Sequence, residues 1–262
     1  MKTKKETFAS VISSFTNQYE ERTVFEDFLT MSVCAYSQNP RTGKSFDEDL
    51  YLATISKYKS EKIRLLFPKM LACIVNEMEE RLWSSEGHDV LGEYYEEHLY
   101  RKGASQYFTP WPVCEFMARM TSSDKVDENG EEMVLKILDP SCGSGRMLLA
   151  HAKENGIVHE YFGIDIDLTC VKMAAINLFL SGIFHSEVLC ADAIDPDDFR
   201  VSYLISKYPF GIFRIKEKEH SYLWNLNKEA FKPSIERIVS PSVSLSKEAD
   251  PNFKDGTQLK LL

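Results

Sequence analysis

The stretch from Met133 to Gly145, MVLKILDPSCGSG, decides the fold. A short apolar run, Met133 to Leu138, ends in Asp139-Pro140 and leads into a turn with two glycines, Gly143 and Gly145. A helical pattern from Met147 to Lys153 follows directly. The spacing of the apolar residues changes across the turn from that of a strand to that of a helix, so the sequence predicts a strand, a loop and a helix in this order.

The same pattern recurs further along the chain. Tyr161 to Ile164 forms a second apolar run, and a helix is expected from about Leu168 to Leu180. A third run, Glu187 to Ala191, comes next. Strands and helices that alternate at this length predict a parallel sheet with helices on its faces, which is an α/β fold.

Each of the three predicted strands is followed by an acid: Asp139, Asp165 and Asp192. Because ligands of open parallel sheets bind beyond the carboxyl ends of the strands, we expect these carboxylates to line one ligand-binding edge. The glycines of the turn let the backbone approach a ligand closely, and the helix that follows offers its N-terminal amides.

The chain before this sheet has a different composition. Glycine is scarce up to about Lys102, and apolar residues recur every three or four positions, most clearly from Ser60 to Trp83, where Pro68 is expected to kink or restart the helix. We therefore predict an α-helical N-terminal domain over residues 1–102 and the α/β domain over 103–217. Residues 218–262 are expected to hold one helix, Tyr222 to Phe231, and a flexible tail.

Composition narrows the class of protein. The 262 residues carry 40 acidic and 31 basic side chains, a net charge of −9 that disfavours a general nucleic-acid coat. The six cysteines are scattered without a C-x-x-C pair, which favours reduced thiols and implies no metal site. The chain has no apolar run near the roughly 20 residues that span a bilayer and no signal-peptide core, so a cytoplasmic protein is expected.

Two cofactor classes compete for the glycine turn. A dinucleotide needs a small residue where this chain has Leu148, so an NAD-dependent oxidoreductase is disfavoured. Asp165 does not discriminate, because an acid at this place could bind the ribose hydroxyls of either cofactor. The segment Gln106-Tyr107-Phe108-Thr109-Pro110, followed by an amphipathic helix from Val113 to Met120, does discriminate.

Four segments, Gln106 to Pro110, Asp139 to Gly145, Gly163 to Asp167 and Asp192, together resemble the class I S-adenosylmethionine-dependent methyltransferases. The likeness is strongest to the N6-adenine DNA methyltransferases that serve as modification subunits of type I restriction-modification systems. Leu91 to Glu96 is similar to the stretch that follows the helical domain in that family. The resemblance implies a Rossmann-like methyltransferase sheet behind an α-helical N-terminal domain.

The resemblance also implies which residues hold S-adenosylmethionine. These are Tyr107, Thr109, Pro110, Asp139, Ser141, Gly143, Gly145, Asp165, Ile166 and Asp192. Tyr107, Thr109 and Pro110 would border the methionine end of the cofactor, and Asp139 with the turn would shape its amino-acid and sugar site. Asp165 would bind the ribose hydroxyls, Ile166 would pack on the adenine ring, and Asp192 would accept from its amine. The sulfonium and ammonium groups are cationic, so an acidic edge suits them.

The catalytic motif of that family is Asn or Asp, then Pro-Pro, then Tyr or Phe, and it is expected after a fourth strand, here the run Val201 to Ile205. This sequence has Lys207-Tyr208-Pro209-Phe210 at that place. A charged lysine offers only donors, whereas the adenine amine needs acceptors. Lys207, Pro209 and Phe210 are therefore the catalytic candidates of a degenerate motif, with Phe210 in the position that stacks on an extruded base. Asp195-Pro196 follows Asp192 too closely to be a better match.

Two hypotheses about function stay open at this point. The first is an adenine-N6 DNA methyltransferase of a restriction-modification system. The second is a catalytically inactive S-adenosylmethionine-binding relative that acts as a regulatory or scaffold subunit, because Lys207 replaces the catalytic Asn. In both, little chain remains after Phe210 for reading a DNA sequence, so DNA recognition is expected through a specificity subunit or another partner.

Overall fold

The computed structural model describes residues 5–15, 18–39, 41–82, 87–100, 107–121, 133–195, 197–226 and 259–261. Its helices are α1 (Phe8–Ile12), η1 (Ser13–Phe15), α2 (Glu21–Ala35), α3 (Glu48–Ile55), α4 (Glu61–Arg64), α5 (Leu66–Arg81), α6 (Val90–Tyr94), η2 (Tyr95–Leu99), α7 (Trp111–Thr121), α8 (Arg146–Asn155), α9 (Leu168–Leu180) and η3 (Lys218–His220). Its strands are β1 (Lys136–Asp139), β2 (Glu160–Asp165), β3 (Ser186–Cys190), β4 (Val201–Lys207), β5 (Phe210–Ile215) and β6 (Leu259–Leu261).

The strands form one six-stranded sheet in the order β5-β4-β3-β2-β1-β6. Strands β1, β2 and β3 are parallel neighbours, joined through α8 and α9. The predicted α/β fold is therefore confirmed, and each of the three predicted strands and both intervening helices lie within a few residues of the expected bounds. Asp139 and Asp165 are the last residues of β1 and β2, and Asp192 lies two residues beyond β3.

The predicted fourth strand, Val201 to Ile205, forms as β4, but it is not parallel to its neighbour. Strand β4 runs antiparallel to β3, with Val201 opposite Cys190 and Ile205 opposite Ser186. The chain then turns at Tyr208-Pro209 into β5, which is antiparallel to β4. The place of the fourth strand in the order 3-2-1-4 of doubly wound sheets, on the far side of β1, is taken by the parallel strand β6.

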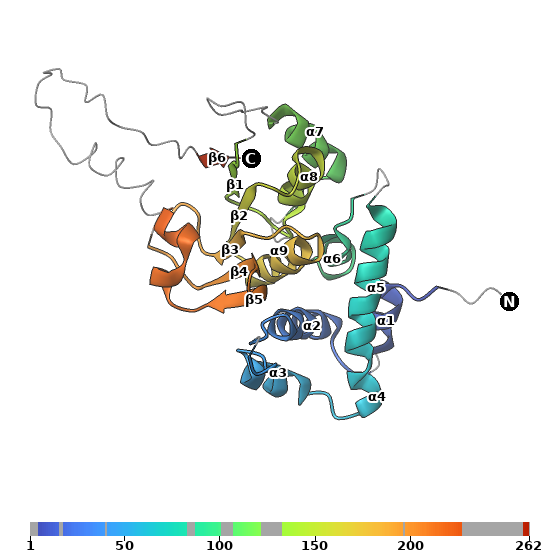
Figure 1. The fold of residues 1–262 in the computed structure, drawn as a ribbon. Helices are drawn as coiled ribbons and strands as arrows, with labels where there is room; N and C mark the ends of the chain where they lie inside the picture. Colours follow the sequence, from blue (N-terminus) through green and yellow to red (C-terminus); the bar gives the residue numbers. More distant parts are fainter. Residues whose placement is uncertain are drawn as a thin grey trace, which may run out of the picture.

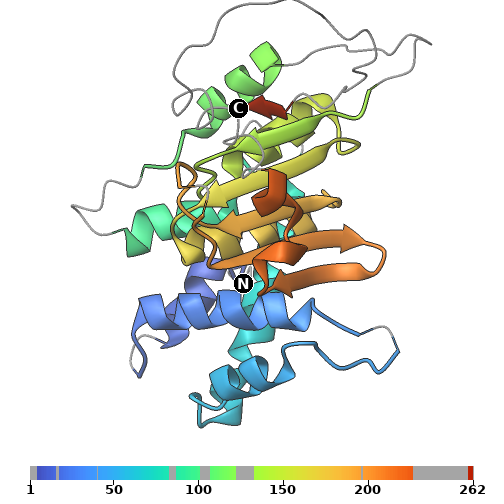
Figure 2. The same cartoon turned by 90° about the vertical axis from the view of Figure 1, so that its left-hand side faces the viewer.

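The two faces of the sheet are covered unequally. Alternate strand residues such as Ile137, Tyr161 and Val188 belong to the large core that includes α8 and α9. Figure 1 shows these helices and α7 on one side of the sheet. The other face forms a small cluster against Leu223 and Trp224. These two residues lie on a short helix at residues 222–226, which lies in front of the sheet in Figure 2.

The helices α1 to α6 pack beyond α9, with α2 directly against it. Their side chains and those of the sheet belong to one continuous core cluster. The helix expected from Ser60 is divided at Leu65 into α4 and α5. Pro68 lies in the first turn of α5, and its ring cannot be accommodated by an unbroken helix. The expected boundary at residue 102 lies outside the described residues.

The C-terminal part agrees with the prediction in one place and differs in another. The expected helix begins at residue 222, where the buried carboxylate of Glu187 accepts from the backbone N–H groups of Tyr222 at 3.0 Å and Leu223 at 3.2 Å. Its continuation to Phe231 lies outside the described residues. The expected loop is wrong for residues 259–261, which form β6. Across the described ranges, each helix is too short or too polar to cross a membrane.

Candidate functional site

A cavity of about 140 Å³ lies at the carboxyl end of β1. Its walls come from three places in the sequence: the segment before α7, the end of β1 with the glycine turn, and the start of α8. Among the predicted site residues, it brings together Tyr107, Thr109, Asp139, Ser141 and Gly143. Two motifs that are about thirty residues apart in the chain therefore face each other across one cavity.

The glycine turn has a backbone that other residues adopt only with strain. Gly143 has φ +54° and Gly145 has φ +84°, both in the left-handed region. A Cβ atom on Gly143 would lie 2.8 Å from the ring of Phe108, and one on Gly145 would lie 3.2 Å from the Cβ of Ala174. Gly143 thus lets the segment 107–110 close onto the turn, and Gly145 starts α8 against α9.

The two acids nearest the cavity are held by backbone amides. Asp139 is only 6% exposed, and its carboxylate accepts from the Ser141 N–H at 3.1 Å. Burial, with a contribution from the charge of Asp165, raises the pKa of Asp139 to about 6. The Asp165 carboxylate accepts from the N–H groups of Gly143 and Asp167, each at 2.8 Å. Burial raises the pKa of Asp165 as well.

The remaining predicted residues lie outside the 140 Å³ cavity. Asp165 does not line the cavity, but it accepts a hydrogen bond from Gly143, which does. Ile166 lies just beyond the end of β2 and is 55% exposed. Asp192 accepts from the Ile194 N–H at 3.1 Å. The predicted residues thus follow the carboxyl edge from β1 to β3 as the sequence implied, with Pro110 exposed before α7.

A buried polar cluster that sequence analysis missed fixes the walls of the cavity. Asp89, which caps α6, is fully buried and accepts from Ser144 Oγ at 2.5 Å, Arg146 Nε at 2.9 Å and Asn177 Nδ2 at 2.8 Å. Its fourth donor is the Gly92 N–H at 2.8 Å. One carboxylate from the helical part therefore ties together the glycine turn, α8 and α9.

Arg146 connects this cluster to the cavity, which it lines. Its Nη1 donates to the Thr109 carbonyl at 3.1 Å, and its guanidinium lies 5.5 Å from the centre of the Phe108 ring. Its Nη2 is buried and has no hydrogen-bond partner among the described residues. The sequence did hold one signal for this cluster, because Asn177 is a lone amide in the apolar helix Met173 to Leu180 and such a side chain needs a buried partner.

The structure does not bring the catalytic candidates to this cavity. Lys207, Pro209 and Phe210 lie at the turn between β4 and β5. Because β4 is antiparallel to β3, this turn lies near Ser186, at the amino end of β3, whereas the cavity lies beyond the carboxyl end of β1. Phe210 instead packs against Phe179, with ring centres 4.9 Å apart. The antiparallel direction of β4 therefore separates these three residues from the 140 Å³ cavity.

Comparisons with known proteins give one family match and two similar solved structures. Residues 86–234 match the model of the N-6 DNA methylase family. Among solved structures, the chain is similar to a type I restriction-modification system methyltransferase subunit from Streptococcus thermophilus, with 16% identity over 73% of this chain and 60% of that chain and a TM-score of 0.36. A second similar structure comes from Listeria monocytogenes and is described as a class I S-adenosylmethionine-dependent methyltransferase. It has 14% identity over 62% of this chain and 51% of that chain, with a TM-score of 0.30.

The chain spans 60% of the length of the first of these structures. The family match covers more than half of this chain, from the residues before Asp89 past the end of β5, and so includes the cavity and the cluster that supports it. This chain belongs to the N-6 DNA methylase family.

Proposed function

We propose that the 140 Å³ cavity holds the amino-acid end of S-adenosylmethionine and that the protein serves methyl transfer to N6 of adenine in DNA. The observation that carries this proposal is the convergence of the segment 107–110 and the glycine turn on one cavity next to Asp139. The family match to N-6 DNA methylases supports the same reaction class.

The residues that line the cavity fit this cofactor chemically. Its ammonium and sulfonium are cations, and Asp139 is a carboxylate whose pKa is raised chiefly by burial, so a cationic ligand would stabilise its charged form. The cofactor also carries a carboxylate, for which the buried, unpartnered Nη2 of Arg146 is a ready donor. The close approach of Phe108 to Gly143 leaves no room for a side chain in the turn.

The rest of the cofactor would extend along the carboxyl edge. We assign Asp165 to the ribose hydroxyls, Ile166 to the adenine ring and Asp192 to the adenine amine, in the order in which β2 and β3 present them. When bound, S-adenosylmethionine supplies an electrophilic methyl group. This chain's own residues would bind it, orient it and exclude water: Asp139 opposite the cationic end, and Tyr107 and Thr109 along the cavity wall.

The alternative of an inactive relative rested on Lys207 in the place of the catalytic Asn. Because β4 is antiparallel to β3, Lys207 lies near the amino end of β3 and not at the carboxyl edge that holds the cavity. Lys207 is therefore no argument against activity. In the order of the sheet, β6 is the strand beside β1, and its carboxyl end leads to the edge that holds Asp139. We therefore expect the target adenine to be received on the β6 side of Asp139.

Recognition of the DNA sequence is proposed to need a partner subunit. The net charge of −9 opposes unaided binding to a polyanion. The solved structure from Streptococcus thermophilus is described as a methyltransferase subunit of a type I system, and we propose an equivalent assembly for this chain.

The test has two stages. Isothermal titration with S-adenosylmethionine, and with its demethylated product, should give heat with the parent chain and at least tenfold weaker binding with Asp139→Ala. Incorporation of tritiated methyl groups into unmethylated DNA, with and without candidate partner subunits, then tests transfer. Binding that is absent, or that Asp139→Ala leaves unchanged, would refute the assignment of the cavity.

A further inference from the structure

A second cavity, of about 530 Å³, lies between the N-terminal helices and the sheet. Its walls come from α2 and α3 on one side, and from α9 and the ends of β3, β4 and β5 on the other. Figure 1 shows α2 and α3 below α9 at this end of the molecule. No described residue lines both this cavity and the 140 Å³ cavity, although Ile166, which we assign to the adenine ring of the cofactor, lies in the wall of the second cavity.

The lining of the second cavity is strongly cationic. It includes Lys57, Lys172, Arg200 and Arg214, and the one carboxylate among its described lining residues is Asp27. Such an excess of positive charge is unusual in a chain with a net charge of −9, where a random patch would be acidic. A cavity of this kind attracts anions.

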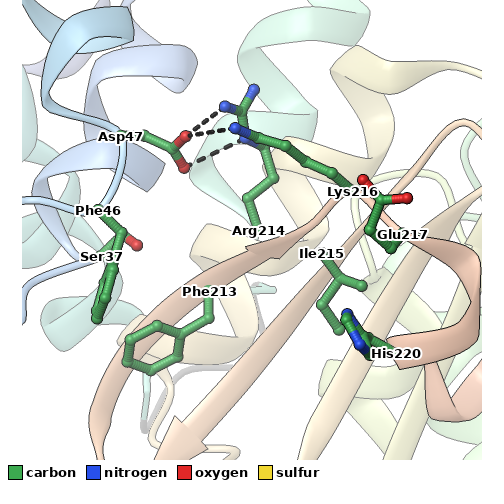
Figure 3. Close-up of a pocket in the computed structure, with 9 residues that line it drawn as sticks. All are labelled: Ser37, Phe46, Asp47, Phe213, Arg214, Ile215, Lys216, Glu217 and His220. Atoms are coloured by element: carbon green, nitrogen blue, oxygen red, sulfur yellow. Dashed lines mark hydrogen bonds and ion pairs between the residues drawn. The ribbon is translucent and has the colours of Figure 1, made fainter.

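Three of the four cations have a carboxylate of their own. Lys57 pairs with Asp27 at 2.7 Å, and Arg200 pairs with Asp198 at 3.2 Å. Arg214 pairs with Asp47. Figure 3 shows, however, that Asp47 also faces Lys216, whose Nζ lies 3.6 Å away, so this carboxylate is shared between two cations.

Lys172 is the cation whose charge is not balanced by a carboxylate. It lies on α9, partly buried against α2, and its ammonium donates to the Thr30 hydroxyl at 2.8 Å. Among the described residues it makes no ion pair. Glu26 and Asp27 on α2 act on its charge, but Glu26 pairs with Arg22 at 3.6 Å and Asp27 pairs with Lys57. Burial lowers the pKa of Lys172. A partly desolvated ammonium without a counter-ion costs free energy, which a bound anion would offset.

We propose that this cavity is a binding site for a small phosphorylated molecule of the nucleotide or sugar phosphate class. The phosphate would lie against Lys172, with Lys57 and Arg200 as further donors, and the apolar side chains of Leu50 and Leu168 would contact the rest of the molecule. The volume is in the range of small-ligand pockets, and the site lies between two parts of the fold, where such pockets are common.

The test is isothermal titration of the whole chain with inorganic phosphate and with adenosine monophosphate, with adenosine as the uncharged probe. We expect phosphate and adenosine monophosphate to bind and to raise Tm, and adenosine to bind at least tenfold more weakly than its monophosphate. Lys172→Met should weaken phosphate binding at least tenfold and, without ligand, leave Tm equal or higher. Lys62→Met, an exposed lysine on α4, is the matched control and should leave binding unchanged.

Arg200→Gln provides a second variant at an exposed position, so the test does not depend on the folding of the Lys172 variant. It should weaken phosphate binding severalfold. Asp139→Asn, at a residue that lines the 140 Å³ cavity and not this one, should leave phosphate binding unchanged, which keeps this proposal distinct from that of the cofactor site. The proposal is overturned if phosphate gives no heat, if both variants bind it like the parent, if Asp139→Asn loses phosphate binding, or if the variants lose only binding to a DNA duplex.

Discussion

Asp139→Asn should make the protein more stable at neutral pH while it weakens cofactor binding. Asp139 is 6% exposed, and the pKa of its carboxyl is raised from an ordinary value of 3.8 to about 6, chiefly because burial penalises the charged form. A raised pKa means that the folded chain binds this proton more tightly than the unfolded chain. Stability is therefore lost as pH rises from about 4 through 6, and the full cost is present above that range.

The size of this cost follows from the two pKa values. A tenfold change in proton affinity corresponds to about 1.4 kcal/mol, so a rise from 3.8 to about 6 corresponds to roughly 3 kcal/mol for the ionised carboxylate at pH 7.5. The neutral amide of the introduced asparagine avoids that cost and keeps an oxygen to accept from the Ser141 N–H. We expect Asp139→Asn to gain a large part of this energy at pH 7.5 and almost none of it at pH 4.

The assay is urea denaturation of parent and variant at pH 4, 6 and 7.5, followed by circular dichroism, with titration of S-adenosylmethionine at pH 7.5. Asp197→Asn, an exposed acid beyond β3, is the control and should differ from the parent by less than about 0.5 kcal/mol at each pH. The reasoning is refuted if the variant is less stable than the parent at pH 7.5, or if its gain in stability does not depend on pH. Either result would show that burial of the charged Asp139 carboxylate does not destabilise the free protein.

Three further predictions concern the turn, its support and the hairpin. Gly143→Ala should lower the free energy of unfolding by about 1–3 kcal/mol and weaken cofactor binding, because φ is +54° and the new methyl group would lie 2.8 Å from the Phe108 ring. Gly156→Ala is the control for backbone strain alone, because φ is +93° there and no atom lies near the new methyl group; it should retain cofactor affinity. Asp89→Asn should lower the free energy of unfolding by about 3–5 kcal/mol in urea titrations, since it leaves the Arg146 guanidinium buried without its close carboxylate. Lys207→Asn should change neither cofactor affinity nor methyl incorporation, and a gain of methyl transfer would contradict the placement of β4.

The carboxyl edge could be predicted from the sequence because its signals are local. When an apolar run ends in an acid and a glycine turn or a helix cap follows, the run is a strand and the acid lies at its carboxyl end. In a parallel sheet these acids then lie along one edge. Asp139 and Asp165 are at the ends of β1 and β2 for this reason. Asp167, two residues on, caps α9 by accepting from the Thr169 N–H at 2.8 Å.

The direction of β4 was harder to predict, since an alternating pattern is the same in parallel and antiparallel strands. Connection length did hold the answer. A parallel crossover needs a dozen or more residues, usually with a helix, whereas ten residues, 191–200, separate β3 from β4. The two-residue turn Tyr208-Pro209 then closes a hairpin. Matching Lys207-Tyr208-Pro209-Phe210 to a motif by its letters ignored this constraint on the path of the chain.

The Asp89 cluster could not be predicted from spacing, because its members come from positions 89, 144, 146 and 177. Its geometry has a consequence for how the site is built. Asp89 belongs to the helical part, whereas Ser144, Arg146 and Asn177 belong to the glycine turn and the two helices of the sheet. If the helical part were removed, the Arg146 guanidinium would lose its close carboxylate and the glycine turn would lose one of the contacts that hold it. We infer that the cofactor site depends on both parts, so that a chain lacking residues before α6 should fail to bind S-adenosylmethionine even if its sheet forms.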